Sequence, residues 1–114
     1  MLVENDDAVR EVIQRALLEV GYQVLEVQRG DEALRLCEEH AGQAIRLALV
    51  DNVLPGGMAV SKLVERLTTA HPRTKVILLS DVEPDPVQNV AFLRKPFMHG
   101  DLLRVVREAL TGAE

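Results

Sequence analysis

Apolar residues follow two patterns that alternate along the chain. Short apolar runs, typical of strands in a buried parallel sheet, occur at residues 1–3, 22–27, 47–51, 75–79 and 90–93. Between them, apolar residues recur at the spacing of one helix face, in residues 9–20, 30–42, 60–67 and 102–110. This alternation predicts an α/β fold in which helices cover both faces of a parallel sheet.

Repeated strand–helix units of this length predict a doubly wound, five-stranded sheet. By analogy with flavodoxin-like folds, we expect the strand order 2-1-3-4-5. The connection before the last strand departs from the pattern. Residues 81–89 must cross over and return in parallel, whereas such crossovers usually need at least about 10–12 residues. Pro84 and Pro86 also disfavour helix there. We therefore expect the fourth helix to be shortened or missing.

Length and composition set the class of protein. The 114 residues suit a single domain, residues 1–114, whose first strand is expected to be truncated at its amino terminus. A net charge of -5 and only 3% aromatic residues argue against nucleic-acid binding, and no segment has the length and hydropathy of a membrane span. Cys37 has no cysteine partner, which fits a reducing, cytoplasmic location. Three histidines show no metal-ligand spacing and are expected at the surface: His40, His71 and His99.

Polar residues stand where the predicted strands end. Glu4 and Asn5 follow the first strand, Asp51 ends the third, Ser80 follows the fourth and Lys95 follows the fifth. Because the carboxyl ends of parallel strands meet at one edge, we expect these side chains to lie close together. Acids gathered there repel each other unless a cation joins them, and their oxygens suit Mg²⁺. Lysine and a hydroxyl suit a phosphoryl group, which a carboxylate can accept as an acyl phosphate.

Each of these residues also has a purely structural interpretation. Asp51 could simply end a strand and hydrogen-bond its turn, and Ser80 could cap the next strand. Lys95 precedes a proline and could be a surface lysine on a turn. Glu4 could belong with Asp6 and its neighbours to a cluster that caps the following helix.

Four segments, in this order and each at a predicted strand end, resemble the receiver domains of two-component response regulators. They are VENDDAVRE at residues 3–11, LVDNVLPGGM at 49–58, LLS at 78–80 and FLRKPF at 92–97. The second and fourth segments are most similar to receivers fused to hybrid histidine kinases. No single segment is specific, but together they cover nearly the whole chain.

The resemblance implies a phosphoacceptor and a metal site. Asp51 would accept the phosphoryl group, and Mg²⁺ would be held by Glu4, Asn5, Asp51 and the backbone carbonyl of Val53. The phosphodonor would be a sensor histidine kinase or a phosphotransfer protein. The domain would not be an enzyme beyond catalysing its own phosphotransfer and dephosphorylation, and weak homodimers are possible.

The resemblance also implies a set of switch residues. Ser80 would turn toward the phosphoryl group, and Lys95 would pair with its oxygens. Pro96 would follow a cis peptide bond. Phe92 would be the aromatic residue whose position reports activation.

Three departures from the family pattern bear on function. Asn5 stands where the family usually has a metal-binding acid, Val60 stands where a glycine is common, and the segment before the last strand is short. The first departure supports an alternative: a pseudo-receiver that binds other proteins with weak or no phosphorylation. The third predicts a reduced output surface.

Two other functions fit the fold but not the residues. A flavodoxin-like cofactor binder needs a phosphate loop after the first strand, whereas the acids around Glu4 would repel phosphate. An aspartate-nucleophile phosphatase would need a second acid two residues after Asp51, where this chain has Val53.

Overall fold

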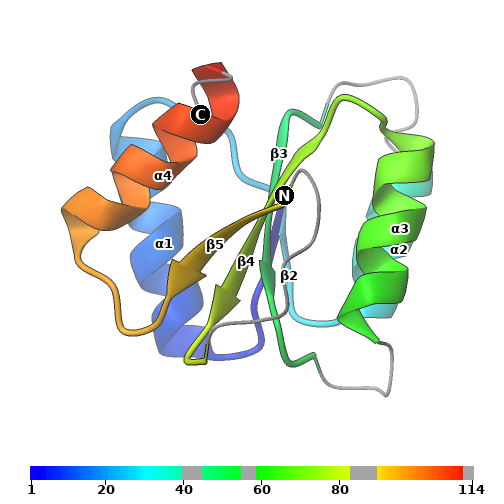
Figure 1. Ribbon diagram of the computed structural model, residues 1–114, viewed down its shortest axis with the longest axis horizontal. Helices are drawn as coiled ribbons and strands as arrows, with labels where there is room; N and C mark the ends of the chain where they lie inside the picture. The colour runs from blue at the N-terminus through cyan, green and yellow to red at the C-terminus, as the bar shows by residue number, and fades with distance from the viewer. Residues whose placement is uncertain (40–44, 55–58, 83–89, 112–114) are drawn as a thin grey trace.

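The protein is built on a five-stranded parallel sheet with the strand order β2-β1-β3-β4-β5 (Figure 1). In this computed structural model, the described residues are 1–39, 45–54, 59–82 and 90–111. The strands are β1 (Leu2–Val3), β2 (Glu26–Val27), β3 (Leu47–Asp51), β4 (Lys75–Ser80) and β5 (Val90–Arg94). The predicted flavodoxin-like, doubly wound architecture is confirmed.

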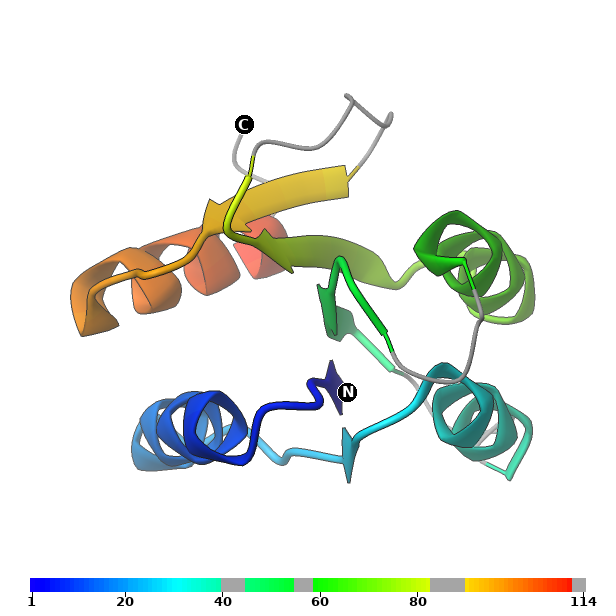
Figure 2. The same cartoon turned by 90° about the horizontal axis from the view of Figure 1, so that it is seen from below.

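Helices cover both faces of the sheet, as the alternating pattern predicts. The described residues form α1 (Asp7–Glu19), α2 (Gly30–Glu39), α3 (Val60–Ala70) and α4 (His99–Thr111). Figure 2 shows α1 and α4 side by side on one face, with α2 and α3 on the other. Among these helices, none is long and apolar enough to cross a membrane.

The apolar runs of the central strands serve both faces in alternation. On β3, Ala48 and Val50 pack toward α2 and α3, whereas Leu49 packs toward α1 and α4. The same alternation holds on β4, where Val76 and Leu78 face one core and Ile77 and Leu79 face the other. An unbroken apolar run is therefore needed, because a polar residue at any of these positions would be buried.

Local signals in the sequence set both ends of α1. Asp6 is the N-cap, and its Oδ1 accepts hydrogen bonds from the backbone N–H groups of Ala8 and Val9. Gly21 has a φ of 93°, and the two residues after the C-cap bond back to the carbonyls of Leu18 and Leu17. This left-handed glycine ends the helix and sends the chain back toward the sheet.

The structure differs from the sequence prediction in β2. The pattern predicts a strand over residues 22–27, but only Glu26–Val27 pairs in the ladder. The partner strand β1 has only Leu2 and Val3 to offer, so the pairing stops where β1 stops. The predicted shortening of the helix before β5 falls on residues 83–89, and the predicted end of α2 near residue 42 falls on residues 40–44. Both predictions lie outside the described residues.

The prediction that all three histidines lie at the surface is wrong for His71. His99 is exposed as predicted, and His40 lies outside the described residues, but the side chain of His71 is buried. Its Nε2 lies 3.1 Å from the backbone carbonyl of Cys37, in the last turn of α2. The ring therefore joins the end of α3 to the end of α2, a role that spacing along the sequence does not reveal.

We expect His71→Leu to lower the free energy of unfolding by about 1–3 kcal/mol, because the carbonyl of Cys37 loses a buried partner. The matched control is His99→Leu, at an exposed position, which should change stability by less than about 0.5 kcal/mol. Urea unfolding of both variants measures the difference. Equal effects of the two substitutions would contradict this role of His71.

Candidate functional site

The parallel sheet brings side chains from four strands to its carboxyl edge. Glu4 follows β1, Asp51 ends β3, Ser80 ends β4 and Lys95 follows β5. The pairing of the strands fixes these positions, because Val50 pairs with Leu78 and both strands end within two residues of this pair. Of the five residues that the sequence places at strand ends, the side chains of Glu4, Asp51 and Lys95 are in direct contact as expected, whereas Asn5 is exposed and the Ser80 hydroxyl contacts Val82.

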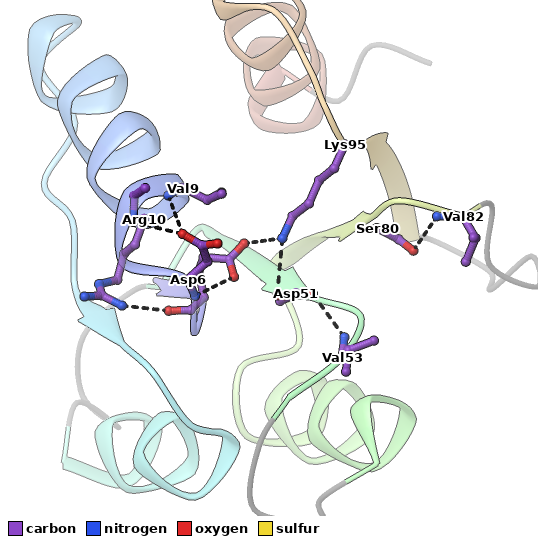
Figure 3. Close-up of polar contacts among 10 residues, drawn as sticks. Asp6, Val9, Arg10, Asp51, Val53, Ser80, Val82 and Lys95 are labelled. Carbon is purple, nitrogen blue, oxygen red and sulfur yellow. Dashed lines mark hydrogen bonds and ion pairs between the residues drawn. The ribbon is translucent and has the colours of Figure 1, made fainter.

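Lys95 lies between the two acids of this edge (Figure 3). Its Nζ donates to Oε1 of Glu4 at 2.5 Å and to Oδ2 of Asp51 at 3.3 Å. The lysine side chain is 21% exposed, that of Asp51 15% and that of Glu4 0%. Lys95 is therefore not a surface lysine on a turn, but the counter-ion of two carboxylates.

Glu4 is the most constrained member of the cluster. Besides Lys95 on Oε1, its Oε2 accepts the backbone N–H of Asp6 at 3.2 Å. Burial raises the pKa of the Glu4 carboxyl, and its contact with Asp51 raises it further, whereas Lys95 and the Asp6 N–H act in the opposite direction. A fully buried carboxylate of this kind needs its cation.

The position of Lys95 is fixed by the backbone around it. Its N–H donates to the carbonyl of Ser80 at 2.7 Å, and the peptide bond to Pro96 is cis, as the resemblance implies. Burial alone would lower the pKa of Lys95, but the hydrogen bond and charge of Glu4, together with those of Asp51, leave that pKa raised. The ammonium group therefore stays charged in its place between the acids.

The two carboxylate oxygens of Asp51 have different partners. Its Oδ1 accepts the backbone N–H of Val53 at 3.0 Å, which closes the turn after β3, while Oδ2 faces Lys95. The side chains of Val53 and Asn5 are exposed. The predicted role of the Val53 carbonyl and of Asn5 as metal ligands remains a prediction.

Ser80 and Phe92 stand beside the cluster. Ser80 is buried, and its Oγ accepts the N–H of Val82 at 3.2 Å, so in this structure its hydroxyl caps the end of β4. Phe92 is half-buried on β5 and pairs with Leu78 of β4. Their expected switching roles are not tested by these contacts.

The sequence pattern does not identify Arg10 as a residue that contacts this site. From the first turns of α1, its Nη1 donates to the backbone carbonyl of Glu4 at 3.0 Å and its Nη2 to Oδ1 of Asp7 at 2.5 Å. Figure 3 shows Arg10 beside the turn that follows β1. The only signal in the sequence is a basic residue six positions after Glu4, which a helical wheel assigns to the solvent side.

Two carboxylates, rather than three, are placed at this edge where they could supply oxygen ligands to a cation. Among the residues that the structure describes, no group of three or more His, Cys, Asp or Glu side chains is arranged to hold a metal ion. Glu4 and Asp51 nevertheless direct one oxygen each at a single ammonium nitrogen. Two converging carboxylates match the small number that Mg²⁺ commonly takes from a protein.

We expect Lys95→Met to destabilise the protein by about 3 kcal/mol at pH 8, because Glu4 is left buried without its cation. Since the pKa of Glu4 is raised above 4.5 in the native state, the native carboxyl can take a proton as the pH falls. The stability that Glu4 contributes is thus present at low pH and is lost as the pH rises through its raised pKa. The cost of Lys95→Met should therefore be smaller at pH 4.5.

Urea unfolding at the two pH values measures this cost. Lys62→Met, at an exposed position on α3, is the matched control and should have little effect at either pH. The double variant Glu4→Gln with Lys95→Met should recover most of the stability at pH 8. An equal cost of Lys95→Met at both pH values would show that the charge of Glu4 is not the cause.

Known proteins match this sequence over nearly the whole chain. A family model for the response regulator receiver domain matches residues 1–107. The sensor kinase CckA of Brucella abortus (strain 2308) is 37% identical over 117 residues, a match that covers 96% of this chain and 12% of CckA. The response regulator receiver protein CpdR of the same strain is 27% identical over 120 residues, covering 99% of this chain and 97% of CpdR.

A solved structure agrees with these relatives. The crystal structure of the receiver domain from the hybrid histidine kinase CckA superposes with a TM-score of 0.84 at 36% identity, covering 96% of this chain and 95% of that one. The chain spans far less than two thirds of two of its relatives: 12% of the CckA sensor kinase and 28% of a cyclic di-GMP phosphodiesterase of Thermotoga maritima. With a family match over most of its length, the chain belongs to the response regulator receiver domains of two-component signalling.

Proposed function

We propose that Asp51 accepts a phosphoryl group from the phosphohistidine of a partner protein, either a sensor histidine kinase or a phosphotransfer protein. One observation carries this proposal: the Asp51 carboxylate ends a buried strand, remains partly exposed and lies 3.3 Å from the Lys95 ammonium group. Kinases of this type use ATP, so we place the domain in the cytoplasm. Its role is to receive and hold the group rather than to turn over a substrate.

The chain's own residues account for the chemistry of the transfer. A carboxylate oxygen of Asp51 forms a bond to phosphorus, the phosphorus–nitrogen bond of phosphohistidine breaks, and its electron pair returns to the imidazole. Lys95 already lies beside Oδ2 of Asp51, so its ammonium group can pair with the oxygens of the transferred group. Glu4 holds Lys95 in reach of that position through its 2.5 Å contact.

The residues at this edge fit Mg²⁺. Glu4 and Asp51 would hold the ion through their carboxylates, with Asn5 and the carbonyl of Val53 as neutral ligands. When bound, Mg²⁺ would neutralise charge that develops on the phosphoryl oxygens.

Ser80 and Phe92 would carry the response to phosphorylation. Ser80 would exchange its bond to the Val82 N–H for one that its hydroxyl donates to a phosphoryl oxygen, which would free the N–H of Val82. Phe92 is half-buried on β5, the neighbouring strand, and would change its burial in the same response. These changes would connect phosphorylation of Asp51 to the surface at β4 and β5.

The second candidate function is that of a pseudo-receiver, which Asn5 favours. Asn5 supplies an oxygen but no charge where the family usually has an acid, and the described residues group no three acids around the site. A domain with this defect would keep the fold and bind its partners without phosphorylation. Labelling experiments separate the two candidates.

We expect incubation with a small phosphodonor and Mg²⁺ to add one phosphoryl group, detected by intact mass. Asp51→Asn should abolish the added mass, because the amide oxygen is a poor nucleophile. Asp31→Asn, at an exposed position on α2, is the matched control and should be labelled like the wild type. Labelling that survives Asp51→Asn would refute the assignment, and an unlabelled wild type would favour the pseudo-receiver.

We expect Asn5→Asp to tighten Mg²⁺ binding by at least about tenfold. A unit charge about 4 Å from a divalent ion contributes about 8 kcal/mol at an effective dielectric constant of about 20, of which solvent removes a large part. Calorimetric titration measures the affinity. Gln23→Glu, exposed before β2 at the opposite edge of the sheet, adds the same charge away from the site and should leave the affinity unchanged. Equal affinities for Asn5→Asp and the wild type would overturn the charge argument.

A further inference from the structure

Arg10 contacts the turn after β1, the first turn of its own helix α1, and strand β2. Its Nη1 donates to the carbonyl oxygen of Glu4 at 3.0 Å, its Nη2 meets Asp7 on α1 at 2.5 Å, and its Nε lies 3.7 Å from Oε1 of Glu26 on β2. The side chain of Arg10 is only 16% exposed, compared with 72% for Arg15, which pairs with Glu11 on the same helix. Arg10 is therefore built into the fold, whereas Arg15 is not.

The contact with the Glu4 carbonyl distinguishes Arg10 from an ordinary helix ion pair. A pair three residues apart, such as Arg10 with Asp7, contributes only a few tenths of a kcal/mol. The bond to Glu4, in contrast, fixes the main chain of a residue whose carboxylate is held by Lys95 and by the Asp6 N–H. Glu4 is thus held at its carbonyl on one side and at both carboxylate oxygens on the other.

The shape of the guanidinium group suits this position. Its planar fork offers several N–H donors in fixed directions, so one side chain can hydrogen-bond a carbonyl and one carboxylate while it faces a second carboxylate at 3.7 Å. A lysine in its place would carry the same charge but only a single nitrogen. Charge alone therefore cannot reproduce what Arg10 does.

We propose that Arg10 is a positioning residue for the acid site: it fixes the Glu4 main chain so that the Glu4 carboxylate meets Lys95 beside Asp51. The relevance of this to phosphotransfer rests on the proposed function. Arg10 touches neither the Asp51 carboxylate nor the Lys95 ammonium in the structure, so it acts only through Glu4. Because Asn5 adds no charge, the placement of the Glu4 carboxylate decides how many carboxylates a cation can reach.

The first test reads the ion pair directly, in protein without metal or phosphodonor. An ammonium group held at 2.5 Å from a buried carboxylate exchanges its protons slowly, so Lys95 should give a resolved signal in nitrogen-selective NMR spectra of lysine ammonium groups at low temperature. Lys95→Met assigns the signal. We expect Arg10→Met and Arg10→Lys to lose it while the dispersion of amide signals is kept, and Arg15→Met to retain it.

Glu26→Gln separates the contact with Glu4 from the charge around Arg10. This variant weakens only the 3.7 Å contact and should keep the Lys95 signal. Loss of the signal in Glu26→Gln to the same extent as in Arg10→Lys would overturn the proposal, because the cause would then be the charge of Glu26. Retention of the signal in Arg10→Met would overturn it as well.

A second measurement connects Arg10 to metal binding. Groups that orient a metal ligand typically change affinity by about tenfold or more when removed, so Arg10→Lys should bind Mg²⁺ about tenfold more weakly than Arg15→Met. Equal affinities would contradict the proposal. If wild-type protein takes no phosphoryl group, the proposed function fails, but the Lys95 signal and its dependence on Arg10 are unaffected. The two failures are therefore distinguishable.

Discussion

The ammonium group of Lys95 joins two carboxylates from different strands at the carboxyl edge of the sheet. Its partners Glu4 and Asp51 lie 91 and 44 residues away in the sequence, so this one cation joins the ends of β1, β3 and β5. Without it, a fully buried carboxylate would face a second acid with no counter-charge, which is among the most costly arrangements a small domain can contain. In the proposed function, a metal ion would use both of these carboxylates and the phosphoryl group would use that of Asp51. Under the proposed function, stability and function would therefore depend on the same side chains.

The sheet makes this arrangement possible because its central strands are buried on both sides. Alternate residues of β3 and β4 fill two separate cores, one under α2 and α3 and one under α1 and α4. Polar side chains are consequently excluded along the strands and are tolerated only where a strand ends. Asp51 and Ser80 are the last residues of β3 and β4, and Glu4 and Lys95 come directly after β1 and β5. The edge that concentrates charge is thus a consequence of how the cores are filled.

Most of the fold and the membership of the site follow from the sequence, because both depend on local patterns. Apolar runs and helical periodicity predict the parallel sheet covered by helices, analogy with flavodoxin-like folds supplies the strand order, and the position of Asp51 at the end of an apolar run predicts its place at the edge. The contacts that were missed depend on distant parts of the chain. The length of β2 is set by β1, the burial of His71 by the end of α2, and the role of Arg10 by a main-chain carbonyl. None of these partners leaves a periodic signal in the sequence.

Asn5 acquires a physical meaning when the charges of the site are followed through the proposed reaction. Glu4, Asp51 and Lys95 together carry one net negative charge, and a divalent cation would turn this into one positive charge. An acyl phosphate at Asp51 would replace one negative charge with roughly two, which returns the loaded site to about neutral. With a second acid at position 5, the loaded site would instead keep a net negative charge. Asn5 thus weakens the attraction for a metal ion in the resting site, yet it balances the charge of the phosphorylated one. If metal and phosphoryl group bind as proposed, an asparagine at position 5 would therefore favour the state in which both are present together.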